Sequence, residues 1–172
     1  RERRCFLCIE NLPEQQKGIP YKDEFLILCN PSPIFAEHFT ISCIHHSPQI
    51  LGPFIPAMLT LARDLSPRLT VFYNGPRCGA SAPDHLHFQA SPTGLIPVEK
   101  AAQDKSHRVF RRSQDSVEIL TLREFGRQVV LLESERPKNL AAVLTSLSES
   151  FRQTIGTIEE PMMNVLCSFA DG

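Results

Sequence analysis

Two strand patterns that lie close together in the sequence constrain the fold more than any other feature. Residues 69–73 form an apolar run that predicts a buried strand, and in residues 84–90 polar and apolar side chains alternate. The alternation places His85, His87 and Gln89 on one face of an extended strand. The chain is therefore expected to contain a sheet that is packed on one face and presents two imidazoles and a carboxamide on the other.

The connection between these strands, residues 74–83, consists of turn formers and small residues. Small residues let backbone N–H groups approach an anion closely, so such a loop can act as a phosphate nest. The histidine pair alone has other interpretations, namely two polar residues on a solvent-facing strand or a metal site of the cupin kind. A cupin site needs a Glu shortly after the pair and a later His on a Gly/Pro-rich strand, but the only later histidine, His107, lies in a charged segment.

The combined stretch from Val71 to Pro92 resembles the active-site segment of the histidine-triad superfamily, in its transferase branch. That branch includes galactose-1-phosphate uridylyltransferase, diadenosine tetraphosphate phosphorylase and GDP-hexose phosphorylases. Residues 72–81 resemble the phosphorylase loop, and residues 85–90 resemble the His-x-His-x-Gln signature. With Cys-Phe-Leu-Cys near its start, the chain is similar to a bacterial group of this superfamily (DUF4922-like). The resemblance implies an α+β fold, a HIT-like antiparallel sheet (half-barrel) with helices packed mainly on one face.

The resemblance also implies roles for individual residues. By its position in the motif, His87 would be the nucleophile that forms a covalent nucleotidyl-histidine, with Gln89 and His85 as the other members of the catalytic set. Neutral imidazole is nucleophilic and becomes a good leaving group once it is phosphorylated. Its other ring nitrogen would be held by a backbone carbonyl, and Gln89 could hydrogen-bond a phosphoryl oxygen. Nucleotide and phosphate contacts would come from Asn74, Gly75, Gly79, Ala80, Ser81 and Asn164.

One departure from the phosphorylase pattern concerns the end of the loop. Asp84 stands between Pro83 and His85, where the pattern places Pro directly before His. A bulge could absorb one extra residue. The assignment of Ser81 depends on that bulge, whereas the assignment of His87 does not.

A second motif, Cys5-x-x-Cys8, is typical of a metal knuckle or of a redox pair. The βαβ pattern that surrounds a thioredoxin-like pair is missing here. Members of the superfamily hold zinc with two such cysteines, a histidine and the first histidine of the signature, which implies Cys5, Cys8, His46 and His85 here. His45 is the adjacent rival of His46. Two thiolates and two imidazoles form a closed tetrahedral set, so the zinc would be structural.

The remaining patterns are consistent with this fold class. Residues 24–29 and 38–44 are expected to pair as antiparallel strands, with His38, Thr40 and Ser42 pointing outward. His38 is interpreted as a turn or edge residue. A helix is predicted from residue 51, starting late because of its prolines, and a second from Pro137 to Gly156. Further strands are expected at 117–122, 128–132 and 162–167, a short helix or loop after residue 94, and a solvated connector at 104–116.

Composition narrows the class of protein. At 172 residues the chain is expected to be a single nucleotidyltransferase domain that lacks its C-terminal continuation. A net charge of −1 argues against a nucleic-acid partner, and no apolar run has the length of a membrane span. The six cysteines are too sparse for a secreted disulfide scaffold, which favours the cytoplasm.

The sequence thus predicts a nucleotidyltransferase or phosphorylase acting on a nucleoside di- or polyphosphate, such as a nucleotide sugar or a dinucleoside polyphosphate. Its partners would be the nucleotide and an inorganic or sugar phosphate acceptor, and assembly as a homodimer is left open. Two alternatives remain. One is a nucleotide hydrolase, with water accepting from the same intermediate, and the other is a nucleotide- or zinc-binding module without catalysis.

Overall fold

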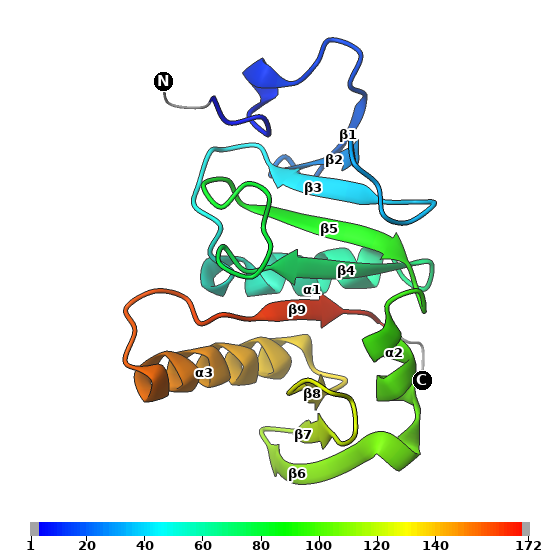
Figure 1. Ribbon diagram of the computed structural model, residues 1–172, viewed down its shortest axis with the longest axis vertical. Helices are drawn as coiled ribbons and strands as arrows, with labels where there is room; N and C mark the ends of the chain where they lie inside the picture. Colours follow the sequence, from blue (N-terminus) through cyan, green and yellow to red (C-terminus); the bar gives the residue numbers. More distant parts are fainter. Residues whose placement is uncertain (1–3, 170–172) are drawn as a thin grey trace.

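The computed structural model describes residues 4–169, which fold into two antiparallel sheets and three α-helices (Figure 1). The larger sheet has six strands in the order β1-β2-β3-β5-β4-β9, and the smaller has three in the order β6-β7-β8. The architecture is α+β, as the sequence predicts. The strands of the larger sheet are β1 (Gly18–Tyr21), β2 (Phe25–Cys29), β3 (Phe39–Cys43), β4 (Leu69–Asn74), β5 (His87–Pro92) and β9 (Asn164–Cys167).

The register of the larger sheet puts the histidine signature in its interior. β5 lies between β3 and β4, with Ser42 opposite His87 on one side and Phe72 opposite Gln89 on the other. β2 and β3 pair antiparallel as expected. The strand that carries the signature is therefore held on both edges, which fixes the direction of its side chains.

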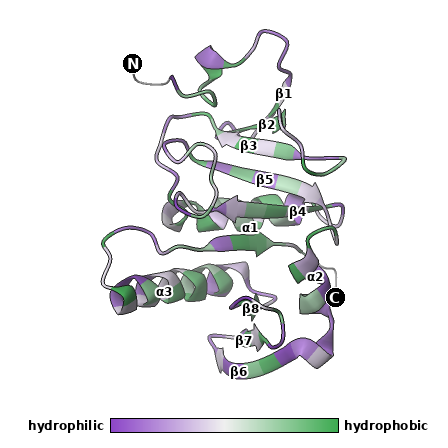
Figure 2. Cartoon of the chain, in the orientation of Figure 1, coloured by the Kyte–Doolittle hydropathy of each residue, from purple (hydrophilic) through white to green (hydrophobic). Residues whose placement is uncertain are grey.

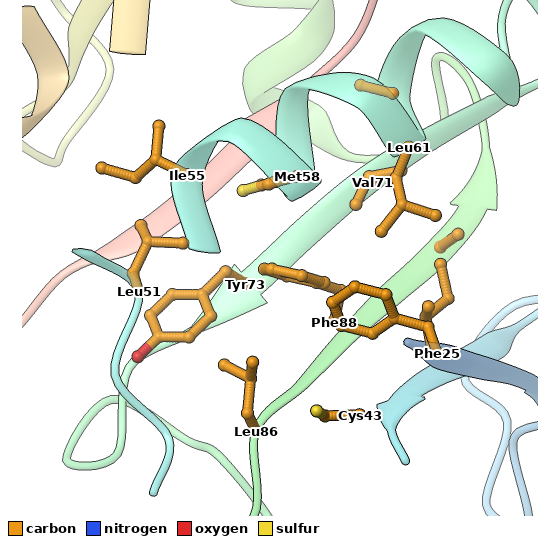
Figure 3. Packing of buried hydrophobic residues seen from close by; sticks show 13 residues of the cluster. Phe25, Cys43, Leu51, Ile55, Met58, Leu61, Val71, Tyr73, Leu86 and Phe88 are labelled. Carbon is orange, nitrogen blue, oxygen red and sulfur yellow. The ribbon is translucent and has the colours of Figure 1, made fainter. Parts of the chain in front are cut away.

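Helix α1 (Ile55–Asp64) covers one face of this sheet and forms the main core with it (Figure 3). A 3-10 turn, η2 (Gly52–Phe54), precedes the helix and contains Pro53, and Pro56 occupies the first turn of α1, where a missing N–H costs nothing. Phe25, Tyr73 and Phe88 are the large aromatic residues of the core, and each is almost fully buried. In Figure 3 the Tyr73 hydroxyl points away from the helix, toward the segment that carries Leu51.

The second half of the chain adds the small sheet and helix α3 (Pro137–Ile155). Val143 of α3 packs on β7, whereas Ala141 and Leu144 of the same helix contact the main core, so α3 joins the two sheets. Hydrophobic and hydrophilic residues alternate along α3 in Figure 2, as an amphipathic helix between a core and solvent requires. The other elements are η1 (Ile9–Asn11), α2 (Pro97–Gln103), η3 (Lys105–His107), β6 (Arg108–Gln114), β7 (Val117–Leu122) and β8 (Val130–Glu133).

Three sequence predictions need correction. The expected connector at 104–116 contains strand β6, an exposed edge strand with a register shift between Phe110 and Arg112. The three side chains of residues 38–44 that were expected to point outward, His38, Thr40 and Ser42, are all buried. The signature strand begins at His87 instead of before His85, because the Leu86 N–H bonds to the Ser47 carbonyl in a neighbouring loop.

Within residues 4–169, none of the helices combines the length and apolarity that crossing a bilayer requires.

Candidate active site and metal cluster

His87 is the first residue of β5, and its ring is set up by its own strand. The ring Nδ1 lies 2.8 Å from the carbonyl oxygen of His85, and only 2% of the residue is exposed. Because a carbonyl can only accept, Nδ1 carries the proton and Nε2 keeps its lone pair. Nε2 is buried and has no hydrogen-bond partner among the described residues. The side chain therefore offers one nitrogen atom, Nε2, with a free lone pair, as a nucleophile requires.

Burial also sets the protonation of the two signature histidines. Desolvation lowers the pKa of His87 below its usual value, while the contact with the His85 carbonyl opposes that change. Desolvation likewise lowers the pKa of His85, against a contact with the Cys43 carbonyl. Both shifts favour neutral rings, and a neutral ring is the nucleophilic and metal-binding form of imidazole.

Gln89 is held by His38, a residue whose role the sequence did not reveal. The Ile34 N–H donates to His38 Nδ1 at 3.2 Å, so the proton of the neutral ring lies on Nε2. His38 Nε2 then donates to the Gln89 side-chain oxygen at 2.8 Å. The His38 ring also stacks on Phe72, with 5.9 Å between ring centroids. With its oxygen engaged, Gln89 keeps its NH₂ group as the end that can donate to a further acceptor.

The loop after β4 is tied to β9 through its first glycine. The Gly75 N–H lies 3.2 Å from both the Met163 carbonyl oxygen and the Asn164 side-chain oxygen. A Cβ at Gly75 would lie 2.6 Å from that Met163 oxygen, so only glycine fits there. The Ala80 N–H returns to the Gly75 carbonyl at 3.4 Å. The loop is thus a closed turn beside the sheet.

The other predicted loop residues line the same turn. Asn74 ends β4 opposite Asn164 of β9, and Gly79 adopts a positive φ of 103° that side chains other than glycine rarely tolerate. Ser81 is exposed. The predicted phosphate residues other than Asn164 thus follow one another from the end of β4 into the loop, and Asn164 contacts this loop from β9.

His85 belongs to a cluster of four possible metal ligands. Cys5, Cys8, His46 and His85 each offer one ligand atom, and all four atoms lie within 4.8 Å of one another. His85 Nδ1 is 3.2 Å from the Cys5 sulfur and 3.6 Å from the Cys8 sulfur. His46 Nδ1 is 3.2 Å from the Cys8 sulfur. The set includes His46 and leaves out His45, which settles which of the adjacent histidines belongs to it.

These separations between ligand atoms fit a cation with tetrahedral coordination. Bond lengths of about 2.3 Å to sulfur and about 2.0 Å to nitrogen place neighbouring S and N ligands about 3.5 Å apart. His85 Nε2 lies 2.8 Å from the Cys43 carbonyl oxygen, which holds the proton on Nε2 and turns the Nδ1 lone pair toward the sulfurs. Burial, followed by contact with Cys5, raises the pKa of the Cys8 thiol to about 11. A bound cation would favour the thiolate form of Cys8 against this shift, so the cluster is compatible with zinc.

Gln49 is the second residue that sequence reasoning missed. It lies in the loop before η2 with 1% of its surface exposed. Its side-chain amide bonds both the N–H and the carbonyl oxygen of His87. A lone Gln outside a strand or helix carries no pattern in the sequence, because its partners lie 25 and 38 residues further along the chain.

Comparison with solved structures gives the same fold. Yeast Ap4A phosphorylase Apa2, in complex with AMP, matches over 87% of this chain with a TM-score of 0.53 and 23% identity. This chain spans 55% of the length of that protein. A DUF4931 family protein from Bacillus cereus matches over 78% of this chain and 72% of its own, with a TM-score of 0.52 and 13% identity. At these identities the likeness concerns the fold. No curated protein matches the chain in sequence.

A family model described as a domain of unknown function, DUF4922, matches residues 1–92. This match covers more than half of the 172 residues, and it includes both the Cys-x-x-Cys motif and the histidine signature. The architecture agrees with that of the phosphorylase neighbour, which is the HIT-like fold that the sequence predicts. The chain therefore belongs to the DUF4922 family, with a HIT-like fold.

Proposed function

We propose that this chain is a nucleotidyltransferase of the phosphorylase type that acts on a nucleoside di- or polyphosphate through a nucleotidyl-His87 intermediate. The observation that carries the proposal is the buried His87 ring, which is bonded through Nδ1 to a carbonyl and has no partner at Nε2 within residues 4–169. A similar fold in a protein that binds AMP, the yeast phosphorylase, supports a nucleotide as the ligand.

In the first step, the Nε2 lone pair of His87 attacks the α-phosphorus and forms a P–N bond. The P–O bond to the departing phosphate breaks, and its electron pair leaves with that phosphate. The Nδ1 proton stays on the ring and donates to the His85 carbonyl while the ring becomes cationic. In the second step, an oxygen of an inorganic or sugar phosphate forms a new P–O bond, and the P–N bond returns its electrons to Nε2.

Gln89 and the loop act on the phosphoryl oxygens in this scheme. The NH₂ group of Gln89, whose oxygen is held by His38, donates to an oxygen on which charge develops. The remaining phosphates are surrounded by loop residues, namely Asn74, Gly75, Gly79, Ala80 and Ser81. Asn164 holds this loop through Gly75. His85 acts through its carbonyl on His87 and through its ring on the cysteines.

Zinc is the metal that we assign to Cys5, Cys8, His46 and His85. Two sulfurs and two nitrogens leave no open position, so the ion would be structural and take no part in the reaction. The ion would join the irregular N-terminal segment to His85, which lies two residues before His87.

A panel of labelled nucleotide sugars and dinucleoside polyphosphates, each with and without inorganic phosphate, tests the proposed function. Phosphate-dependent product is the expected result. Product that forms equally well without phosphate would favour the hydrolase alternative. Binding without turnover across the panel would favour a nucleotide-binding module and overturn the proposal.

A further inference from the structure

The amide of Gln49 stands at the point where strands β4 and β5 separate. Their pairing runs from Leu69 opposite Pro92 to Phe72 opposite Gln89. Two residues further along the same register, Asn74 would face His87, and a regular ladder would exchange two main-chain hydrogen bonds between them. That exchange is replaced by the Gln49 side chain.

Three hydrogen bonds make this replacement. The His87 N–H donates to the Gln49 side-chain oxygen at 2.8 Å. The Gln49 NH₂ group donates to the His87 carbonyl at 3.0 Å and to the Asn74 carbonyl at 3.0 Å. The amide thus forms the hydrogen bonds to the His87 main chain that a neighbouring strand would form. It also separates β4 from β5 at the point where the loop after β4 leaves the sheet.

Gln49 is itself fixed at its own main chain. Its N–H donates to the Pro83 carbonyl at 3.2 Å, and its carbonyl oxygen lies 3.0 Å from the Tyr73 hydroxyl. Tyr73 is fully buried, and its hydroxyl also lies 2.6 Å from the Glu160 carboxylate. The other oxygen of Glu160 accepts the Leu51 N–H at 2.7 Å. The main chain of Gln49 is therefore held by β4 and by the loop after β4. The segment before β9 supports it through Glu160.

We infer that Gln49 is a positioning residue for His87. The hydrogen bond from His87 Nδ1 to the His85 carbonyl requires a defined main-chain conformation across residues 85–87, and the Gln49 amide fixes both polar main-chain atoms of His87. Without the Gln49 amide, the first residue of β5 can adopt more main-chain conformations, and the His87 ring is no longer held in one orientation. The consequence for the reaction rate rests on the proposed function, whereas the consequence for the ring does not.

The test compares Gln49→Met, which keeps the length of the side chain and removes its hydrogen bonds, with the wild-type chain. Thr70→Val is the matched control, because Thr70 is also buried and hydrogen-bonded on β4 but lies at the far end from His87. The first readout is the NMR signal of the His87 ring in the full chain without nucleotide. Gln49→Met should broaden or lose the hydrogen-bonded Nδ1–H resonance, and Thr70→Val should retain it.

The second readout is the single-turnover rate of adduct formation, normalised to the fraction of chains that become labelled. Gln49→Met should slow this rate by about 10²-fold, the loss that a misplacement of about 1 Å can cause, with little change in nucleotide affinity. Normalisation removes the effect of a merely unstable variant. If Gln49→Met does not fold, Gln49→Asn keeps the amide on a side chain one methylene shorter, and it should show the same two changes to a smaller degree.

A wild-type ring signal together with a wild-type normalised rate in the folded Gln49 variant would overturn the inference. If the wild-type chain forms no adduct with any nucleotide, the proposed function fails, and the NMR comparison alone decides the role of Gln49.

Discussion

At the scale of single residues, the site depends on which ring nitrogen or amide atom is already engaged. His87 uses Nδ1 on its own strand, and Gln89 uses its oxygen on His38. The sequence predicted that His87 and Gln89 share a strand, because alternation is a local property. It could not predict the contacts of His38 or Gln49, because those depend on strand pairing and loop closure between residues far apart in the sequence.

Gln89→Ala should bind nucleotide with near-normal affinity and transfer it about 10²–10³ times more slowly, the usual loss for one oxyanion-type donor. The NH₂ group is the end of Gln89 that His38 leaves available, so its effect should fall on the transition state. Separate measurement of the dissociation constant and of the single-turnover rate checks this. A variant that transfers at the wild-type rate would remove Gln89 from the mechanism.

At the scale of elements, apolar periodicity predicted the strands and helices that build the main core. Pattern failed at β6, where an exposed edge strand buries too little surface to show a period of two. It also failed on β3, where the polar face is covered by the site and not by solvent: Ser42 lies against Leu7 and His85. Polar residues on this strand were expected to point outward, whereas in this fold Ser42 contacts other buried groups.

Leu61→Ala in α1 should lower the free energy of unfolding by about 2–5 kcal/mol, because the side chain is fully buried in the main core and its loss leaves a cavity. Arg63→Ala, an exposed position of the same helix, should change it by no more than about 0.5 kcal/mol. Urea unfolding of both variants makes the comparison. Equal stability of the two would contradict the core described here.

Gly75→Ala should lower the free energy of unfolding by about 1–3 kcal/mol, because the new methyl group would push the Met163 carbonyl away from β4. It should also weaken nucleotide binding, since the loop begins at this residue. Gly52→Ala is the control, because a Cβ there meets nothing within 4 Å. If thermal unfolding and nucleotide titration do not separate the two variants, the attachment of the loop to β9 does not have the role given to it.

At the scale of the whole molecule, three parts of the chain contact either the histidine signature or the loop that precedes it. The N-terminal segment reaches His85 through the two cysteines, and the loop before η2 reaches His87 through Gln49. β9 reaches the loop after β4 through Asn164. No local pattern in the sequence predicts these contacts, because they join residues far apart along the chain. Only the resemblance to the histidine-triad superfamily suggested that Cys5 and His85, 80 residues apart, would come together.

Protein purified without a His tag should contain about one zinc per chain, and Cys5→Ser/Cys8→Ser should lose it, because a closed Cys₂His₂ site retains its metal. Cys29→Ser, an exposed thiol outside the cluster, is the control and should keep the metal. Elemental analysis provides the measurement. Zinc content that does not differ between the double variant and the control would rule out the assignment and leave the account of His87 unchanged.

The central claim is that His87 carries the nucleotide during the reaction. The most direct measurement is to trap the wild-type chain with a nucleotide labelled at its α-phosphate, isolate the acid-labile adduct, and locate it by peptide mass. The label should lie on His87 and be absent in His87→Ala, with His45→Ala, an exposed histidine outside the site, labelled normally. A label on another residue, or near-normal turnover in His87→Ala, would contradict the account.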